Sequence, residues 1–101
     1  MKTKSKREEL RMKYKDMYAY SVERIKQKIN DNYRLRDSQP QLKTFYDGAI
    51  FGLFECLDMM KTDITVWMSE KDLKDIGLDF DPLEKYDSGT MFDDIDDEVT
   101  D

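Results

Sequence analysis

The stretch LKTFYDGAIFGLFECLDMM, residues 42–60, is the most apolar part of the chain, with twelve apolar residues among its nineteen. Six of them alternate spacings of four and three residues, the heptad pattern of a helix that packs along other helices: Leu42, Tyr46, Ala49, Leu53, Cys56 and Met60. Further apolar residues widen this seam on both sides and leave only a narrow polar wedge. A helix that is apolar around most of its circumference must be surrounded by protein. We therefore predict a buried central helix over residues 42–60.

Two glycines, Gly48 and Gly52, lie inside this helix, and Cys56 follows one turn later. A glycine in a helix costs about 1 kcal/mol relative to alanine, so the pair indicates a close approach by another segment. That segment is either the first helix of the same chain or a helix of a second chain. Phe51 lies in the polar wedge, where it is either covered by later residues or exposed as an interface anchor.

The apolar seam is wider than one neighbouring helix can cover. We therefore predict a homodimer or a higher oligomer. The residues expected near the contact are Gly48, Phe51, Gly52 and Cys56.

A second apolar stripe predicts a long first helix that ends near residues 30–32. Its members recur every three or four residues: Leu10, Tyr14, Met17, Tyr18, Val22, Ile25 and Ile29. Ser5 and Glu8 fit a capping box at its start, and Ser38 with Gln41 repeats that signal before the central helix. We expect the first helix to pack antiparallel against the central helix.

The chain after residue 60 divides into three parts. Residues 64–68 are β-branched and aromatic, and they fit a strand, a packed linker or a helical turn. A short third helix is capped at Ser69 and ends at Gly77 in a Schellman motif. Residues 79–101 hold ten acids and few apolar groups, so we predict a disordered acidic tail. The predicted fold is all-α: a helical hairpin and a third helix in residues 1–78, then the tail.

The residue types that most often perform catalysis are scarce. The chain has no histidine and one cysteine, and it contains neither a glycine-rich phosphate loop nor a nucleophile elbow. We therefore expect a protein that is not an enzyme and holds no metal or other cofactor. The single cysteine excludes an internal disulfide and favours a reducing compartment. With no secretory signal and no apolar run of membrane-spanning length, we expect a cytoplasmic protein without membrane contact.

Charge is distributed unevenly along the chain. Residues 1–36 contain twelve Lys/Arg against five acids, whereas residues 79–101 contain ten acids against one lysine. This asymmetry indicates charged partners or contact between the two ends of the chain. The tail sets apolar groups among carboxylates, which suits docking into a basic groove of a protein partner. The expected partner-binding residues are Phe92, Asp93, Asp94, Ile95, Asp96 and Asp97.

We thus expect an inhibitor or accessory protein that acts by occupying a partner's surface, although the tail could also serve solubility alone. The shortage of alanine and the abundance of lysine and tyrosine are typical of AT-rich genomes, and in composition the chain is similar to small accessory proteins of phages and mobile elements.

Two other functions fit the basic first helix. Its Lys/Arg and Tyr side chains could bind nucleic acid, with the acidic tail as an autoinhibitory competitor, or they could simply form a solvated face. They could also hold a small anionic ligand between the protomers of an oligomer. The candidate anion-binding residues are Lys13, Lys15, Arg24 and Lys28.

Overall fold

The protein is all-α, as predicted. The structure, a computed structural model, describes residues 5–66 and 68–95 of the chain and contains no strand within those two ranges. Its elements in chain order are α1 (Lys6–Ser38), the 3₁₀ turn η1 (Pro40–Leu42), α2 (Lys43–Thr65), α3 (Glu70–Ile76) and α4 (Pro82–Ser88).

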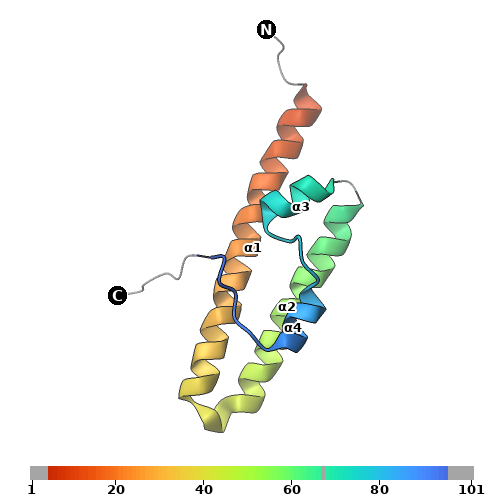
Figure 1. The fold of residues 1–101 in the computed structure, drawn as a ribbon. Coiled ribbons are helices and arrows are strands. Elements are labelled where there is room, and N and C mark those ends of the chain that lie inside the picture. Colours follow the sequence, from red (N-terminus) through yellow and green to blue (C-terminus); the bar gives the residue numbers. More distant parts are fainter. Residues whose placement is uncertain (1–4, 67, 96–101) are drawn as a thin grey trace, which may run out of the picture.

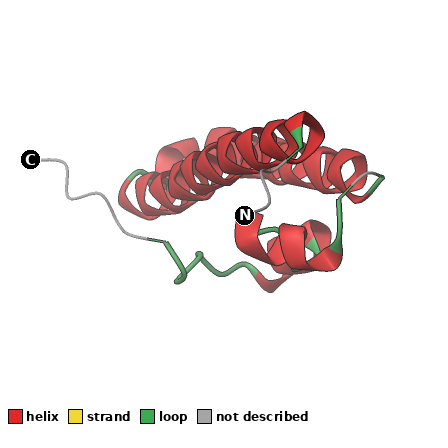
Figure 2. Ribbon diagram, turned by 90° about the horizontal axis from the view of Figure 1, so that it is seen from above, coloured by secondary structure: helices red, strands yellow, loops and turns green. Residues whose placement is uncertain are grey.

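The two long helices form one layer. α1 and α2 lie side by side, run in opposite directions and are joined by η1 (Figure 1). The short helices α3 and α4 and the chain that follows them lie on one side of this pair (Figure 2). α1 has 33 residues and α2 has 23, so the first turns of α1 project beyond the other elements. One side of the α1–α2 layer is therefore covered by the chain's own C-terminal part.

α1 is longer than predicted, because the polar residues near its expected end stay inside the helix. The Asn32 side chain donates to the Lys28 carbonyl, one turn earlier, at 2.7 Å. Tyr33 follows and is buried in the core, which favours continuation of the helix. Ser38, expected to cap the next helix, is the last residue of α1, and its hydroxyl donates to the Leu35 carbonyl.

α2 also extends further than predicted. It begins at Lys43 after the 3₁₀ turn, without a side-chain cap, and continues to Thr65. Ile64 is buried, so the β-branched segment starts as the last turn of α2 rather than as a strand. Position 67 lies outside the described residues.

α3 begins and ends as its sequence signals predict. The Ser69 hydroxyl accepts from the Asp72 N–H at 3.2 Å, and the Asp72 carboxylate accepts from the Ser69 N–H at 3.1 Å. Gly77 has φ 93°, a left-handed conformation that suits glycine, and the Leu78 N–H donates to the Leu73 carbonyl.

The prediction of a disordered tail is wrong for residues 79–95. The Asp81 carboxylate accepts from the N–H groups of Leu83 and Glu84 and caps α4, which ends at Gly89. Residues 89–95, here called the C-terminal strap, then return to α1. Although the segment has few apolar residues, it inserts them into the core, with Pro82 and Phe92 buried. Residues 96–101 lie outside the described residues.

Phe92 attaches the C-terminal strap to both long helices. Its side chain is 8% exposed and stacks on Phe54 of α2, with ring centroids 5.7 Å apart. Its backbone N–H donates to Asn30 Oδ1 at 2.8 Å, and Asn30 Nδ2 donates to its carbonyl at 2.9 Å. Asn30 therefore satisfies both backbone groups of a buried residue 62 positions away.

Lys26 joins the basic helix to the acidic strap. Its side chain is 3% exposed, and its Nζ lies 5.0 Å from the Phe92 ring centroid and 5.1 Å from that of Phe80. The same Nζ forms an ion pair with Asp94 at 2.9 Å. A buried ammonium needs such partners, because desolvation without them is costly. The basic and acidic ends of the chain thus contact each other.

Phe92→Ala tests whether the C-terminal strap is part of the core. Removing a buried aromatic ring leaves a cavity, so we expect the free energy of unfolding to fall by about 3–5 kcal/mol. Urea denaturation followed by circular dichroism measures this change. Asp93→Ala is the matched control, since Asp93 is exposed and its replacement should change stability by less than about 0.5 kcal/mol. Equal stability of the two variants would show that the strap does not pack on α1 and α2.

Candidate interaction surface

One face of α2 is left uncovered by the rest of the described chain. Phe45 is 67% exposed and Met59 is 65% exposed, although both are large apolar residues. Gly48, Gly52 and Cys56 lie between them at helical spacing. We call these five residues the open face of α2. Buried side chains occupy the other side of the helix: Tyr46, Ile50, Phe54, Leu57 and Ile64.

Three of the predicted self-association residues lie on this open face. Cys56 is exposed, and a Cβ atom built on Gly48 or Gly52 would meet nothing within 4 Å. The first helix therefore does not approach the glycines, which excludes the intramolecular explanation for them. Phe51 lies apart: its ring packs edge-on against Tyr86 of α4 at 5.2 Å and remains 41% exposed.

The projecting part of α1 carries more exposed apolar side chains. Leu10, Tyr14 and Met17 belong to the stripe that was predicted to be buried, but each is exposed in the structure. α2 is too short to reach them, and burial along the stripe begins only further along α1, at Val22 and Ile29.

The four candidate anion-binding residues do not converge. Lys13, Arg24 and Lys28 are exposed, and Arg24 lies over the ring of its neighbour Tyr20 at 5.6 Å. Lys13 and Arg24 are eleven residues apart, about 16 Å along the helix. Lys15 instead faces α3. These positions therefore do not form one pocket for an anion.

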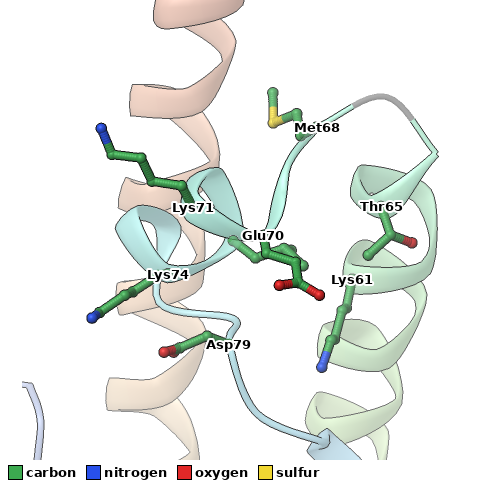
Figure 3. Close-up of a pocket in the computed structure, with 8 residues that line it drawn as sticks. Lys61, Thr65, Met68, Glu70, Lys71, Lys74 and Asp79 are labelled. Carbon is green, nitrogen blue, oxygen red and sulfur yellow. The ribbon is translucent and has the colours of Figure 1, made fainter.

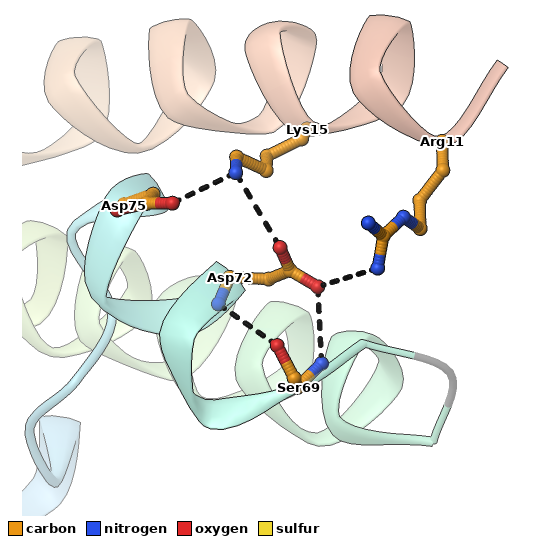
Figure 4. A network of polar contacts seen from close by, with 5 residues as sticks. All are labelled: Arg11, Lys15, Ser69, Asp72 and Asp75. Atoms are coloured by element: carbon orange, nitrogen blue, oxygen red, sulfur yellow. Dashed lines mark hydrogen bonds and ion pairs between the residues drawn. The ribbon is translucent and has the colours of Figure 1, made fainter. Parts of the chain in front are cut away.

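Lys15 belongs to an ion-pair network that attaches α3 to α1 (Figure 4). Its Nζ lies 2.7 Å from Asp75 and 3.4 Å from Asp72, and Arg11 reaches Asp72 at 3.4 Å. The Ser69 N–H, which donates to the Asp72 carboxylate, lowers the pKa of that carboxyl, and Lys15 and Arg11 act in the same direction. The hydrogen bond from Lys15 lowers the pKa of Asp75 and raises that of Lys15 itself. Lys15 thus has a structural role.

The predicted partner-binding tail is mostly engaged within the chain. Phe92 is buried and Asp94 pairs with Lys26, so neither is presented as an anchor. Ile95 packs partly against the core, whereas Asp93 is exposed. Asp96 and Asp97 lie outside the described residues. Phe92 is therefore part of the protein's own core and Ile95 is partly buried against it, so neither is the freely exposed anchor that we expected.

An open cleft of about 760 Å³ separates the end of α2 from α3 (Figure 3). Met68 and Leu73 supply its apolar lining. The side chains of Lys71 and Lys74 extend away from α2, and Lys61 donates to the Phe80 carbonyl. Two of the three lysines that line the cleft therefore point out of it, and the third is already bonded to a backbone carbonyl, so we assign no ligand to this cleft.

Neither a metal centre nor a membrane span is found in the described part of the chain. Within residues 5–66 and 68–95, no three His, Cys, Asp or Glu side chains come together in a group that could hold a metal ion. Among the same residues, no helix has the length and apolar character needed to span a membrane. Comparisons with protein families, curated proteins and solved structures find no match to this chain.

The sequence analysis included Phe45 and Met59 among the residues that widen the apolar seam, but it did not name them as the residues left exposed. A signal was nevertheless present. The two large residues stand at equal distances on either side of Gly52, with Gly48 and Cys56 between them at equal distances as well. Large residues that flank a run of small ones in this way are typical of a helix face on which another backbone can approach closely.

Asp72→Asn tests the attachment of α3 to α1. Because the folded protein lowers the pKa of Asp72, the ionised carboxylate stabilises the fold above the ordinary Asp pKa. That contribution is lost as the pH falls below about 4 and then through the lowered pKa of Asp72 in the folded protein. We expect Asp72→Asn to melt at a lower temperature than the wild type at pH 7, with the difference shrinking by about pH 3. Thermal melts over this range measure it, with Asp93→Asn as the exposed control. A difference that stays constant with pH would contradict the network.

Proposed function

We propose that this protein is a non-catalytic binding protein that holds a protein partner on the open face of α2. The observation that carries this proposal is the two-thirds exposure of both Phe45 and Met59 on a face whose five residues include no charged one. Large apolar groups gathered on one exposed face are typical of interaction sites. Burying each of them on binding would contribute about 1.5–3 kcal/mol.

The shape of this face suits a helical partner. Phe45 and Met59 stand at its ends, and the small residues Gly48, Gly52 and Cys56 lie between them with open space beside the two glycines. An apolar helix laid along this face would bury the two large residues as anchors and approach the α2 backbone closely. A homodimer or higher oligomer is one such assembly, and an inhibitor bound to another protein is a second.

The basic projection of α1 supports a role in partner attraction rather than in anchoring. Residues 1–15 carry seven Lys/Arg against two Glu. Such a cluster accelerates association with acidic surfaces and loses its effect as salt rises. The proposed anchors are therefore apolar, while the basic projection of α1 steers the encounter.

A quantitative affinity capture tests this function. The wild type, a Phe45→Asp/Met59→Asp variant and a Leu83→Asp/Met91→Asp control are immobilised and exposed to host lysate. Leu83 and Met91 are 43% exposed apolar residues outside the open face, so the control adds the same two charges elsewhere. Because a charge placed on each anchor opposes its burial, we expect capture of specific partners to fall at least about tenfold with the first variant only.

Both variants should keep the wild-type helical content, because every altered side chain is exposed. The proposal fails if the open-face variant captures the same proteins, in the same amounts, as the wild type.

A further inference from the structure

We infer that the occupant of the open face is a second copy of this chain, whose α2 runs antiparallel to the first across a two-fold axis at Gly52. This inference rests on the proposed function, since it names the partner of the same face. It is carried by the order of large and small residues along α2 and by the positions of the nearest charges.

The open face is symmetric about Gly52. Phe45 lies seven residues before Gly52 and Met59 seven after it, while Gly48 lies four before and Cys56 four after. In an antiparallel pair centred on Gly52, each position faces the one at the same distance on the other side. Phe45 of each copy then faces Met59 of the other, and Gly48 faces Cys56.

This register matches large residues with large ones and small with small. The Gly48–Cys56 and Gly52–Gly52 pairs let the two backbones approach, since nothing in the described chain occupies the space beside either glycine. The two Phe45–Met59 pairs then close the ends of the contact. Two side chains that are two-thirds exposed in each copy thereby become buried. An isologous contact of this kind is self-complementary, as a two-fold dimer requires.

Charge favours the antiparallel over the parallel arrangement. Glu55 borders the open face, and Asp63 lies one turn beyond its end at Met59. An antiparallel pair places Glu55 opposite Ala49 of the other copy, and it places Asp63 opposite Gln41. A parallel pair would instead set each of these acids opposite itself, which is unfavourable. It would also bring the two basic N-terminal projections side by side, whereas the antiparallel pair keeps them at opposite ends.

The covered side of the layer does not obstruct this pairing. α3, α4 and the C-terminal strap all lie on one side of the α1–α2 layer (Figure 2). The residues of α2 that pack toward the core, such as Ile50 and Phe54, are buried already and take no part in the pairing. Two copies can therefore associate without rearrangement of either chain.

Cysteine cross-linking in Gly48→Cys tests the register. Within one chain, positions 48 and 56 are eight residues apart, about 12 Å along the helix, which is too far for a disulfide. The added side chain meets open space, so the variant should fold as the wild type does. We expect mild oxidation to give a covalent dimer in which the cysteine introduced at position 48 of one copy is joined to Cys56 of the other. Peptide mass spectrometry identifies this bond.

A matched control places the cysteine elsewhere on the same helix. Thr62→Cys in a Cys56→Ser background is exposed but outside the open face. Because the two introduced thiols would not meet in the antiparallel pair, this variant should cross-link at least about tenfold less.

Two outcomes of this experiment would overturn the inference. Dimers joined only between like positions, 48 to 48 and 56 to 56, would show a parallel pair. A sedimentation mass of a single 12.1 kDa chain at every concentration would show that no second copy binds. In that second case the affinity capture still decides whether the open face binds another protein, so the two failures can be told apart.

Gly52→Leu gives an independent test of the axis position. Its side chain has room in the single chain but would collide with its own copy at the two-fold axis. We expect the sedimentation mass to fall from that of two chains to that of one, with unchanged helical content. Thr62→Leu should remain a dimer. A Gly52→Leu protein that stays dimeric would place the axis elsewhere and overturn the inference.

Discussion

Water must be kept away from the apolar circumference of α2, and the described chain does this on one side only. Phe54 and Leu57 on that side are fully buried beneath α1, α4 and the C-terminal strap, whereas Phe45 and Met59 on the other side are left about two-thirds exposed. The arrangement of the other elements accounts for this difference in exposure between the two sides of α2. A 101-residue chain folds its C-terminal part over one face of a two-helix layer and has no further segment among the described residues to cover the other face.

The covering of the first face depends on polar contacts as much as on apolar ones. Lys26 is buried, which would be unfavourable alone, but Asp94 and the rings of Phe80 and Phe92 surround its ammonium group. Asn30 satisfies the backbone of Phe92. The acidic segment therefore has a structural role: Asp94 neutralises the buried Lys26 of α1, and Phe92 supplies an aromatic ring to the core.

Local signals in the sequence predicted the two long helices and α3, but not the ends of α1 and α2 or the presence of α4. Contacts between distant residues explain why the acidic segment is ordered. The caps of α3 involve residues only a few positions apart, so Ser69, Asp72 and Gly77 were sufficient to define it. The burial of Phe92 depends on Asn30, which lies 62 positions away. The acidic composition of residues 79–101 predicted disorder and gave no indication of this contact. In the predicted self-association strip, Gly48 and Cys56 are exposed, and a Cβ atom at Gly48 or Gly52 would meet nothing within 4 Å. Its role in self-association stays a prediction. Of the two predicted tail anchors, Phe92 is buried and Ile95 is partly buried, because the same aromatic group that could bind a partner also fits the chain's own core.

The central claim is that the chain leaves the open face of α2 uncovered and that a second copy covers it. Methionine oxidation by hydrogen peroxide tests this most directly, because a thioether reacts only where peroxide reaches it. Mass spectrometry measures the oxidation of each methionine across a range of protein concentrations. Met59 lies on the open face, while Met17 is 61% exposed on α1 and Met68 is buried, so the protein contains its own references. The account predicts that Met59 reacts as fast as Met17 in dilute solution and becomes protected as the concentration rises, with Met68 slow throughout. Slow oxidation of Met59 at concentrations where the protein sediments as a single chain would contradict the account, since the chain's own residues would then cover the face. Fast oxidation at every concentration would show that no second copy covers it.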